Sequence, residues 1–170
     1  MKTTSRLSIL TLTSLALLTG CVTEYRPDTS VPFAAIHEFS SKNSINLING
    51  QPSTERQFFA GKTYANMNEW SNLAIRITSR ELSKRGMTVR NNAQKSLTLS
   101  IVSAKTTAGI VMINSDISMT VRASNGYSKT YTGNDSSAMV GNPRSEMDTA
   151  LMQVVAAMLN DPEIVAFLTK

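Results

Sequence analysis

Few side chains in this sequence could act as nucleophiles, general bases or soft metal ligands. The 170 residues include one cysteine, Cys21, and one histidine, His37. A single cysteine excludes an intrachain disulfide and a cysteine metal cluster, and a single histidine excludes metal motifs built on two histidines. The chain also has no G-x-S-x-G turn that would present a catalytic serine. We therefore predict no catalytic residue, no metal site and no cofactor.

Pairs of carboxylates could still perform acid–base chemistry without histidine. Glu146 and Asp148 fall in the first turn of a predicted helix, where acidic side chains favour the helix dipole. Asp116 and Asp135 sit in or near predicted loops, without the acidic run of a calcium site. These acidic residues therefore give only weak support to an enzyme that uses two carboxylates on cell-wall sugar, and we favour this hypothesis least.

The first 20 residues have the composition of a secretory signal. Lys2 and Arg6 are followed by an apolar run from Leu7 to Leu18. These 12 residues are fewer than the roughly 20 apolar residues that a transmembrane helix needs. A basic start, a short apolar run and small residues after it indicate a signal that is cleaved.

The tetrapeptide Leu18-Thr19-Gly20-Cys21 resembles the lipobox of bacterial lipoproteins. The resemblance implies cleavage before Cys21, a diacylglycerol on its thiol, and acylation of the freed amine by a fatty acid such as palmitate. Several acyl chains anchor a protein stably, whereas one chain is marginal. Val22 and Thr23 stand where an aspartate would imply retention in the inner membrane. We therefore expect an anchor in the outer membrane that faces the periplasm.

Cleavage also removes much of the net positive charge. The full chain has 17 basic and 12 acidic residues, and loss of Lys2 and Arg6 leaves 15 basic residues and a net charge of +3. So small an excess, scattered along the chain, is not a nucleic-acid patch. We expect a membrane as partner through the acyl chains, and no nucleic acid.

The mature chain divides into a tether and a domain. Residues 21–43 are polar and contain Pro27 and Pro32, which break regular structure, so we interpret them as the tether segment. Phe33 to Phe39 is apolar enough for part of this segment to pack. Residues 44–170 are the predicted periplasmic domain.

Helical periodicity predicts two main helices in the domain. Asn66, with an acidic residue three positions later, indicates an N-cap, and Gly86 indicates the helix end. Trp70 falls on the apolar stripe of this helix and is expected in the core. Asn142-Pro143 opens the second helix, because proline suits the first turn.

Strand signals surround the first helix. Ile45–Ile48 is a short strand candidate, and Leu97–Ile101 and Ile117–Val121 alternate apolar and polar residues. Residues 51–63 are predicted to be a loop. Ile110 to Ile113 is continuously apolar and is either the start of the later strand or a separate buried turn.

Asn125-Gly126 predicts a hairpin with a two-residue type I′ turn. Residues 127–132 then return as a strand near the sheet edge, and a polar loop follows from residue 133 to 141. In this register Arg122, Tyr127, Lys129 and Tyr131 share one face. Cations beside aromatic rings on that face would suit an anionic glycolipid or a partner protein, and a solvated strand face is the plain alternative.

The order of these elements predicts an α+β fold. Two helices with one apolar stripe each, beside a small, mainly antiparallel sheet with one apolar face, suit a two-layer sandwich with the order β-α-β-β-β-α. Both helices are expected on the same face of the sheet.

Three stretches resemble small outer-membrane lipoproteins of Gram-negative bacteria. They are the helix end and strand from Glu81 to Val89, the strand beginning at Leu97 with the later Ser124-Asn125-Gly126 turn, and the closing helix from Leu159 to Leu168. The chain is similar to the YajG-type lipoproteins and, in outline, to the lipopolysaccharide-assembly lipoprotein LptE. The resemblance implies an interaction or assembly role and transfers no catalytic residue.

These observations lead to one expected function. The chain is expected to be a non-enzymatic, lipid-anchored periplasmic module that assists or tethers a cell-envelope assembly through a protein partner. Binding of lipopolysaccharide or another glycolipid is the alternative.

Overall fold

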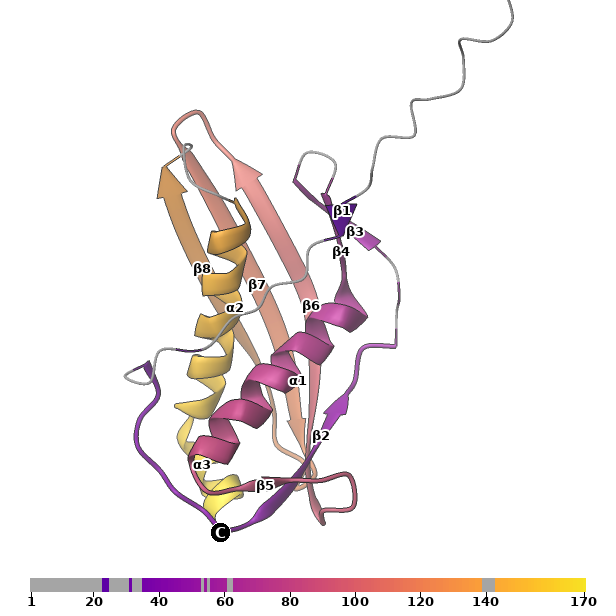
Figure 1. Cartoon of the computed structure of the whole chain (residues 1–170), viewed down its shortest axis with the longest axis vertical. Helices are drawn as coiled ribbons and strands as arrows, with labels where there is room; N and C mark the ends of the chain where they lie inside the picture. The colour runs from indigo at the N-terminus through magenta and orange to yellow at the C-terminus, as the bar shows by residue number, and fades with distance from the viewer. Residues whose placement is uncertain are drawn as a thin grey trace, which may run out of the picture.

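The computed structural model describes residues 23–24, 31, 35–52, 54, 56–60, 63–138 and 143–170. They form an α+β fold in which helices cover one face of a five-stranded sheet, as predicted (Figure 1). In chain order, the elements of this part are β1 (Thr23–Glu24), β2 (Ser44–Asn49), β3 (Arg56–Ala60), β4 (Thr63–Asn66), α1 (Met67–Lys84), β5 (Thr88–Val89), β6 (Lys95–Ala108), β7 (Met112–Ala123), β8 (Ser128–Ala138), α2 (Pro143–Leu159) and α3 (Pro162–Thr169).

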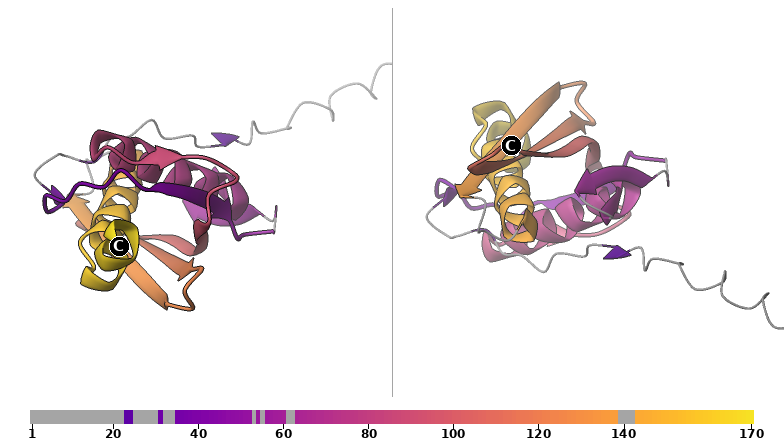
Figure 2. Two further views of the ribbon diagram at one scale, coloured as in Figure 1. Left: turned by 90° about the horizontal axis from the view of Figure 1, so that it is seen from below. Right: turned by 90° about the horizontal axis from the view of Figure 1, so that it is seen from above.

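The main sheet has the strand order β5-β2-β6-β7-β8. β2 runs parallel to both of its neighbours, whereas β6, β7 and β8 form an antiparallel meander. Parallel strands need a crossover connection, and α1 supplies it between β2 and β6. α1 packs against β6 and β2, and α2 packs against β8 and β7 (Figure 2). The returning strand β8 is an edge strand, as predicted.

Helix α1 begins and ends where the sequence predicts. The Asn66 side chain accepts hydrogen bonds from the backbone N–H groups of Asn68 and Glu69, which satisfies two free donors of the first turn. At the other end Gly86 has a φ of 83°, a conformation that glycine adopts without strain. Trp70 is only 2% exposed and belongs to the core.

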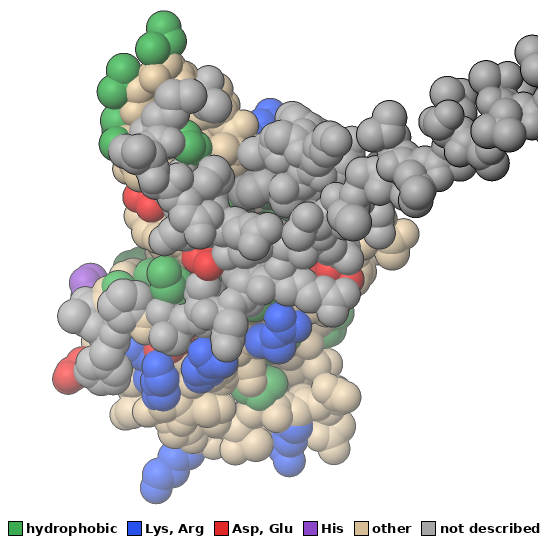
Figure 3. Space-filling model, turned by 45° about the horizontal axis from the view of Figure 1, so that its top comes forward, with side chains coloured by type: hydrophobic (Ala, Val, Ile, Leu, Met, Phe, Trp, Pro, Cys, Tyr) green, Lys and Arg blue, Asp and Glu red, His purple; other side chains and the backbone are tan. Residues whose placement is uncertain are grey.

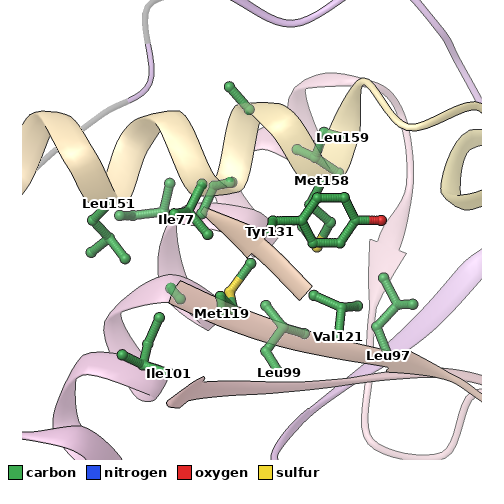
Figure 4. Close-up of a cluster of buried hydrophobic side chains, with 14 of the residues drawn as sticks. Ile77, Leu97, Leu99, Ile101, Met119, Val121, Tyr131, Leu151, Met158 and Leu159 are labelled. Atoms are coloured by element: carbon green, nitrogen blue, oxygen red, sulfur yellow. The ribbon is translucent and has the colours of Figure 1, made fainter. Parts of the chain in front are cut away.

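The core fills the space between the sheet and the two long helices (Figure 4). Alternate residues of β6 and β7 point into it because successive side chains of a strand point to opposite faces. The fully buried side chains of this layer are Leu97, Leu99, Ile101, Ile117, Met119 and Val121, and those of α2 are Met147, Ala150, Leu151, Val154, Val155, Met158 and Leu159.

A bulge in β6 is stabilised from outside the sheet. The register with β7 shifts between Ile101 and Ser103, so Ile101 pairs with Met119 and Val102 has no partner in the ladder. The backbone N–H of Ile101 donates to the buried Oγ of Ser71 on α1 at 2.8 Å, and the Ile101 carbonyl accepts from Nε2 of Gln51 at 3.0 Å. Both polar groups are therefore satisfied, and α1 is fixed against β6 at this point.

Part of the predicted tether segment packs on the domain. Ile36 is buried in the core, and the backbone N–H of His37 donates to Oδ1 of Asn160 at 2.7 Å. The side chains of Ser41 and Asn43 donate to the carbonyl of Leu168 at 3.1 and 3.0 Å, which satisfies the end of α3. The partial packing that the sequence allowed for Phe33–Phe39 is therefore seen from residue 35 onward.

A buried acidic side chain lies at the end of α1. Glu81 is fully buried, and its carboxylate accepts from Nζ of Lys84 at 2.7 Å and from Nη1 of Arg85 at 3.0 Å. The Arg85 guanidinium also lies 5.3 Å from the centre of the Phe39 ring. This pairing connects the helix end to the docked part of the tether segment.

The predicted loop at residues 51–63 is wrong for residues 56–60 and for Thr63, which lie on strands. β3 and β4 form an antiparallel pair, and β1 adds to β4 in parallel to make a small second sheet. The strand signal was missed because Phe58 and Phe59 are consecutive, so β3 has no alternation of apolar and polar residues.

The apolar run Ile110–Ile113 is not a buried turn. Ile110 and Val111 form the turn between β6 and β7, and β7 begins at Met112. The three side chains at positions 110–112 are all exposed, and only Ile113 is buried. We call Ile110, Val111 and Met112 the apolar tip.

Candidate functional site

The structure separates Arg122 from the other three predicted site residues. Gly126 donates to the carbonyl of Ala123 at 3.0 Å and has a φ of 94°, and Ala123 donates to the carbonyl of Tyr127 at 2.8 Å. The hairpin therefore has a three-residue loop with a glycine bulge, not the predicted two-residue type I′ turn. No described residue except glycine has a positive φ, so Asn125 does not adopt the conformation that type I′ requires.

One extra loop residue changes every facing pair of the hairpin. Arg122 pairs with Ser128, Val121 with Lys129, and Met119 with Tyr131. A shift of one residue moves side chains to the other face of a sheet, so Arg122 lies on the exposed face, away from the helices. The predicted single face of Arg122, Tyr127, Lys129 and Tyr131 is therefore wrong in its geometry.

The other three residues converge on one carboxylate. Oδ2 of Asp161 accepts from the hydroxyl of Tyr127 at 3.0 Å, from Nζ of Lys129 at 2.6 Å and from the hydroxyl of Tyr131 at 3.0 Å. Oδ1 of the same residue accepts from the backbone N–H of Glu163 at 2.9 Å and caps α3. We call these four side chains, Tyr127, Lys129, Tyr131 and Asp161, the Asp161 cluster.

Sequence reasoning did not find Asp161 as a member of this group. The stretch Asn160-Asp161-Pro162 interrupts the helical pattern, which by itself indicates only the end of the second helix. Aspartate before a proline is, however, the pattern of an N-cap followed by the first helical position. That signal locates the cap of α3, whereas the contact with β8 depends on tertiary packing.

The hydrogen bonds of the cluster fix its charges. Burial alone would raise the pKa of the Asp161 carboxyl, but the hydrogen bonds from Lys129, the Glu163 backbone and the two tyrosines lower this pKa to about 2. The hydrogen bond to Asp161 raises the pKa of the Lys129 ammonium. Burial, with hydrogen bonds to Tyr127 and Asp161, raises the pKa of the Tyr131 phenol. At neutral pH none of these three groups is poised to exchange a proton. The cluster is therefore better suited to holding α3 against β8 than to acid–base catalysis.

We expect Asp161→Asn to lose stability in a pH-dependent way. The carboxyl has a pKa of about 2 in the folded protein against an ordinary value of 3.8, so its contribution is full above about pH 4 and disappears as pH falls toward 2. The variant should lose on the order of 2 kcal/mol of unfolding free energy at neutral pH and little near pH 2. Urea unfolding of both proteins across this range measures the difference.

The matched control is Glu163→Gln, an exposed acid at the start of the same helix. It should change the unfolding free energy by no more than about 0.5 kcal/mol at any pH. A difference between Asp161→Asn and the unmodified protein that stays constant with pH would contradict the assigned role of the carboxylate.

Asp116 and Asp135 are on strands, not in or near loops as predicted. Both border a polar hollow of about 490 Å³ at the upper end of the sheet, together with Thr107, Asn114, Asn134 and Ser136. Asp116 pairs with Asn134, one residue before Asp135, so the two carboxylates belong to opposite faces of the sheet. They do not form the facing pair that glycoside hydrolysis uses.

The described residues contain neither a candidate metal site nor a single helix that could span a membrane. Among these residues, no group of three or more His, Cys, Asp or Glu side chains lies close enough to hold a metal ion. No single helix there meets the length and hydropathy needed to cross a bilayer, although α2 from Met147 and α3 meet them together as a pair bent by 63°.

The predicted lipidation site, Cys21, lies outside the described residues. Two residues later, Thr23 and Glu24 form β1, which pairs in parallel with Thr63 and Tyr64 of β4. β1 therefore ties the chain that follows the predicted lipidation site to the small sheet.

Comparison with solved structures supports the fold. A crystal structure of a protein from Xanthomonas campestris matches with a TM-score of 0.58 and 16% identity, over 85% of this chain and 96% of that one. A hypothetical protein from Chlamydia trachomatis has a TM-score of 0.44 and 16% identity, over 74% of this chain and 95% of that one. A minor lipoprotein from Acinetobacter baumannii has a TM-score of 0.40 and 10% identity, over 76% and 92%. Only the first is similar enough to bear on the fold.

Comparison of sequences identifies the class as a lipoprotein. Residues 61–169 match the profile of a family described as uncharacterized lipoprotein. Because this match covers more than half of the chain, the protein belongs to that lipoprotein family. A search of curated protein sequences finds no significant match. The predicted membership of a lipoprotein family is thus confirmed, whereas the likeness to YajG-type proteins and to LptE stays a resemblance.

Proposed function

We propose that this protein is a lipid-anchored, non-enzymatic module of the outer membrane that faces the periplasm and assists a cell-envelope assembly by binding a protein partner. The observation that carries the proposal is the membership of residues 61–169 in a lipoprotein family, together with a signal that ends at Cys21. A signal of this type implies three acyl chains at the mature N-terminus, which is stable anchoring.

Two features of the structure support a binding module. The pairing of β1 with β4 holds the anchored end of the chain against the domain, so the domain works close to the bilayer. The buried core and the Asp161 cluster make the body rigid, and a rigid surface loses little conformational entropy when it binds a partner.

The alternative ligand, lipopolysaccharide or another anionic glycolipid, has weaker support. Its recognition was predicted to use Lys129, but Asp161 neutralises that ammonium at 2.6 Å. Arg122 remains exposed on the other face, opposite Ser128. One exposed cation without the adjacent aromatic rings is a poor site for an anionic glycolipid, so we favour a protein partner.

The anchor is tested by Cys21→Ser in the full chain. We expect this variant to accumulate as an uncleaved precursor and to lose acylation, because serine has no thiol to form the thioether. Mass spectrometry of the mature N-terminus and membrane fractionation measure both effects. Val22→Ser is the matched control, since it changes the next residue and leaves the thiol in place, and it should fractionate like the unmodified protein. Normal acylation of Cys21→Ser would overturn the proposal.

The partner is tested separately, by crosslinking in intact cells followed by purification of the lipidated protein. We expect a defined envelope protein to be recovered with the unmodified chain and to be reduced with Cys21→Ser, because the variant is held in a different place. Recovery of the monomer alone, with the anchor intact, would contradict a role in assembly.

A further inference from the structure

The β6–β7 turn carries the largest exposed apolar group among the described residues. Ile110 is 93% exposed, Val111 66% and Met112 42%. Figure 3 shows hydrophobic side chains gathered at the projecting end of the molecule, where this turn lies. Single exposed apolar residues are common on proteins, but three consecutive ones at a protruding point mark an interaction site.

Local folding does not explain the residue types of the apolar tip. Hairpin turns favour glycine, asparagine and aspartate, whereas β-branched residues such as Ile110 and Val111 favour extended strands. Neither residue packs into the core. A polar pair would form the turn more easily and would avoid contact of apolar side chains with water. The tip therefore conflicts with the local rules, as residues with a separate function do.

The tip is held firmly by the strands beneath it. β6 and β7 pair from Leu97 with Ala123 up to Ala108 with Ile113, and the backbone N–H of Gly109 donates to the carbonyl of Met112 at 2.8 Å. The turn is thus the end of a long hydrogen-bonded ladder and is presented in one orientation.

The charges near the tip suit contact with lipid. Residues 106–115 contain no charged side chain, and the nearest charges on the hairpin, Lys105 and Asp116, are facing partners in the register. These partners lie about 13 Å along the strands from the turn, given about 3.3 Å per residue. Between them and the tip stand polar residues, Thr106, Thr107, Asn114 and Ser115, which suit the depth of lipid headgroups.

The apolar tip lies at the same end of the molecule as the anchored end of the chain. The β6–β7 turn is at the top of Figure 1 and β1 lies below it in the upper part, whereas the C-terminus is at the opposite end. Since Cys21 precedes β1 by two residues in the sequence, acyl chains on Cys21 would bring this end of the domain to the bilayer.

We propose that Ile110, Val111 and Met112 insert into the interfacial region of the phospholipid bilayer that holds the acyl chains of Cys21. This proposal rests on the anchor in the proposed function and adds a second contact to it. Three side chains at a convex point are enough to enter the outer few ångströms of a bilayer. They are too few for a stable protein interface, which buries about 1,200 Å² or more.

The test places a fluorophore on the tip of the full, lipidated chain. Val111→Cys adds the only free thiol, because the thiol of Cys21 is consumed by lipidation. The thiol is labelled with the environment-sensitive dye NBD, and the protein is reconstituted into vesicles of phosphatidylethanolamine and phosphatidylglycerol. The matched control is Val102→Cys, at a residue that is 46% exposed on β6 and lies about 20 Å along the strand from the turn.

We expect the probe at position 111 to shift its emission to shorter wavelength and to be quenched by lipids with nitroxides on their acyl chains, severalfold more than the probe at position 102. The probe at 102 should instead be quenched by aqueous iodide. Flotation of both labelled proteins with the vesicles reports the anchor independently. Failure of both to float would refute the anchor, whereas flotation with an iodide-accessible probe at 111 would refute the insertion of the tip. Shielding of that probe in whole envelopes but not in lipid vesicles would point to a protein occupant and would equally overturn the proposal.

Discussion

Gly133→Ala is expected to lower the free energy of unfolding by about 3 kcal/mol or more, at the upper end of the cost of overpacking. Gly133 lies in β8 where α2 crosses the strand. A Cβ atom at this position would overlap the carbonyl oxygen of Ala150 and would lie 3.0 Å from the backbone nitrogen of Val154. These are backbone atoms of a helix packed into the core, so they cannot rotate away as a side chain could, and α2 must move.

The matched control is Gly126→Ala in the β7–β8 loop. Gly126 has a φ of 94° and would have no atom within 4 Å of an added Cβ. Its replacement therefore tests backbone strain alone and should cost about 1–2 kcal/mol. Urea unfolding of both variants gives the comparison. If Gly133→Ala proves as stable as Gly126→Ala, the close approach of α2 to β8 is wrong.

The second large effect is expected at Glu81. Glu81→Ala should reduce the unfolding free energy by about 3–5 kcal/mol, because it removes the carboxylate that neutralises the buried guanidinium of Arg85. The Glu81 side chain is fully buried and that of Arg85 is 5% exposed, so water cannot replace the lost partner in the folded state. The docking of Phe39 over Arg85 should loosen at the same time, which limited proteolysis near residue 39 can measure.

Lys84→Ala serves as the control for Glu81, since Lys84 donates to the same carboxylate from a side chain that is 38% exposed. Its loss should cost no more than about 1 kcal/mol, as for other exposed ion pairs. Equal effects of Glu81→Ala and Lys84→Ala would contradict the central role of the buried pair.

Periodicity and capping rules are sufficient to predict the two long helices and most strands of the main sheet. Asn66 and Gly86 mark the ends of α1 because capping depends on neighbouring residues only. β8 was different, since residues from 133 onward read as a polar loop. Gly133 pairs with Ile117 in the sheet, and α2 leaves no room for a Cβ atom at this position. The need for glycine thus comes from a tertiary contact, which leaves no local signal.

The candidate site could be predicted only in part. Lys129 and Tyr131 do share one side of β8, and Tyr127, which comes just before the strand, reaches the same carboxylate. Arg122 lies outside the Asp161 cluster because the hairpin loop has three residues. The pair Asn125-Gly126 fits both a two-residue and a three-residue loop, so the sequence does not decide between them. Asp161 joins the group from 30 to 34 residues away through the packing of α3, which no spacing rule contains.

Strand β7 has 12 residues and runs without a break from the apolar tip to the Asn125-Gly126 loop. At about 3.3 Å per residue it measures roughly 40 Å. If the tip rests on the bilayer as proposed, the far end of β7 stands away from the lipid by a corresponding distance. The Asn125-Gly126 loop at that far end would then contact a factor or a layer about 40 Å from the lipid, while the tip stays at the bilayer.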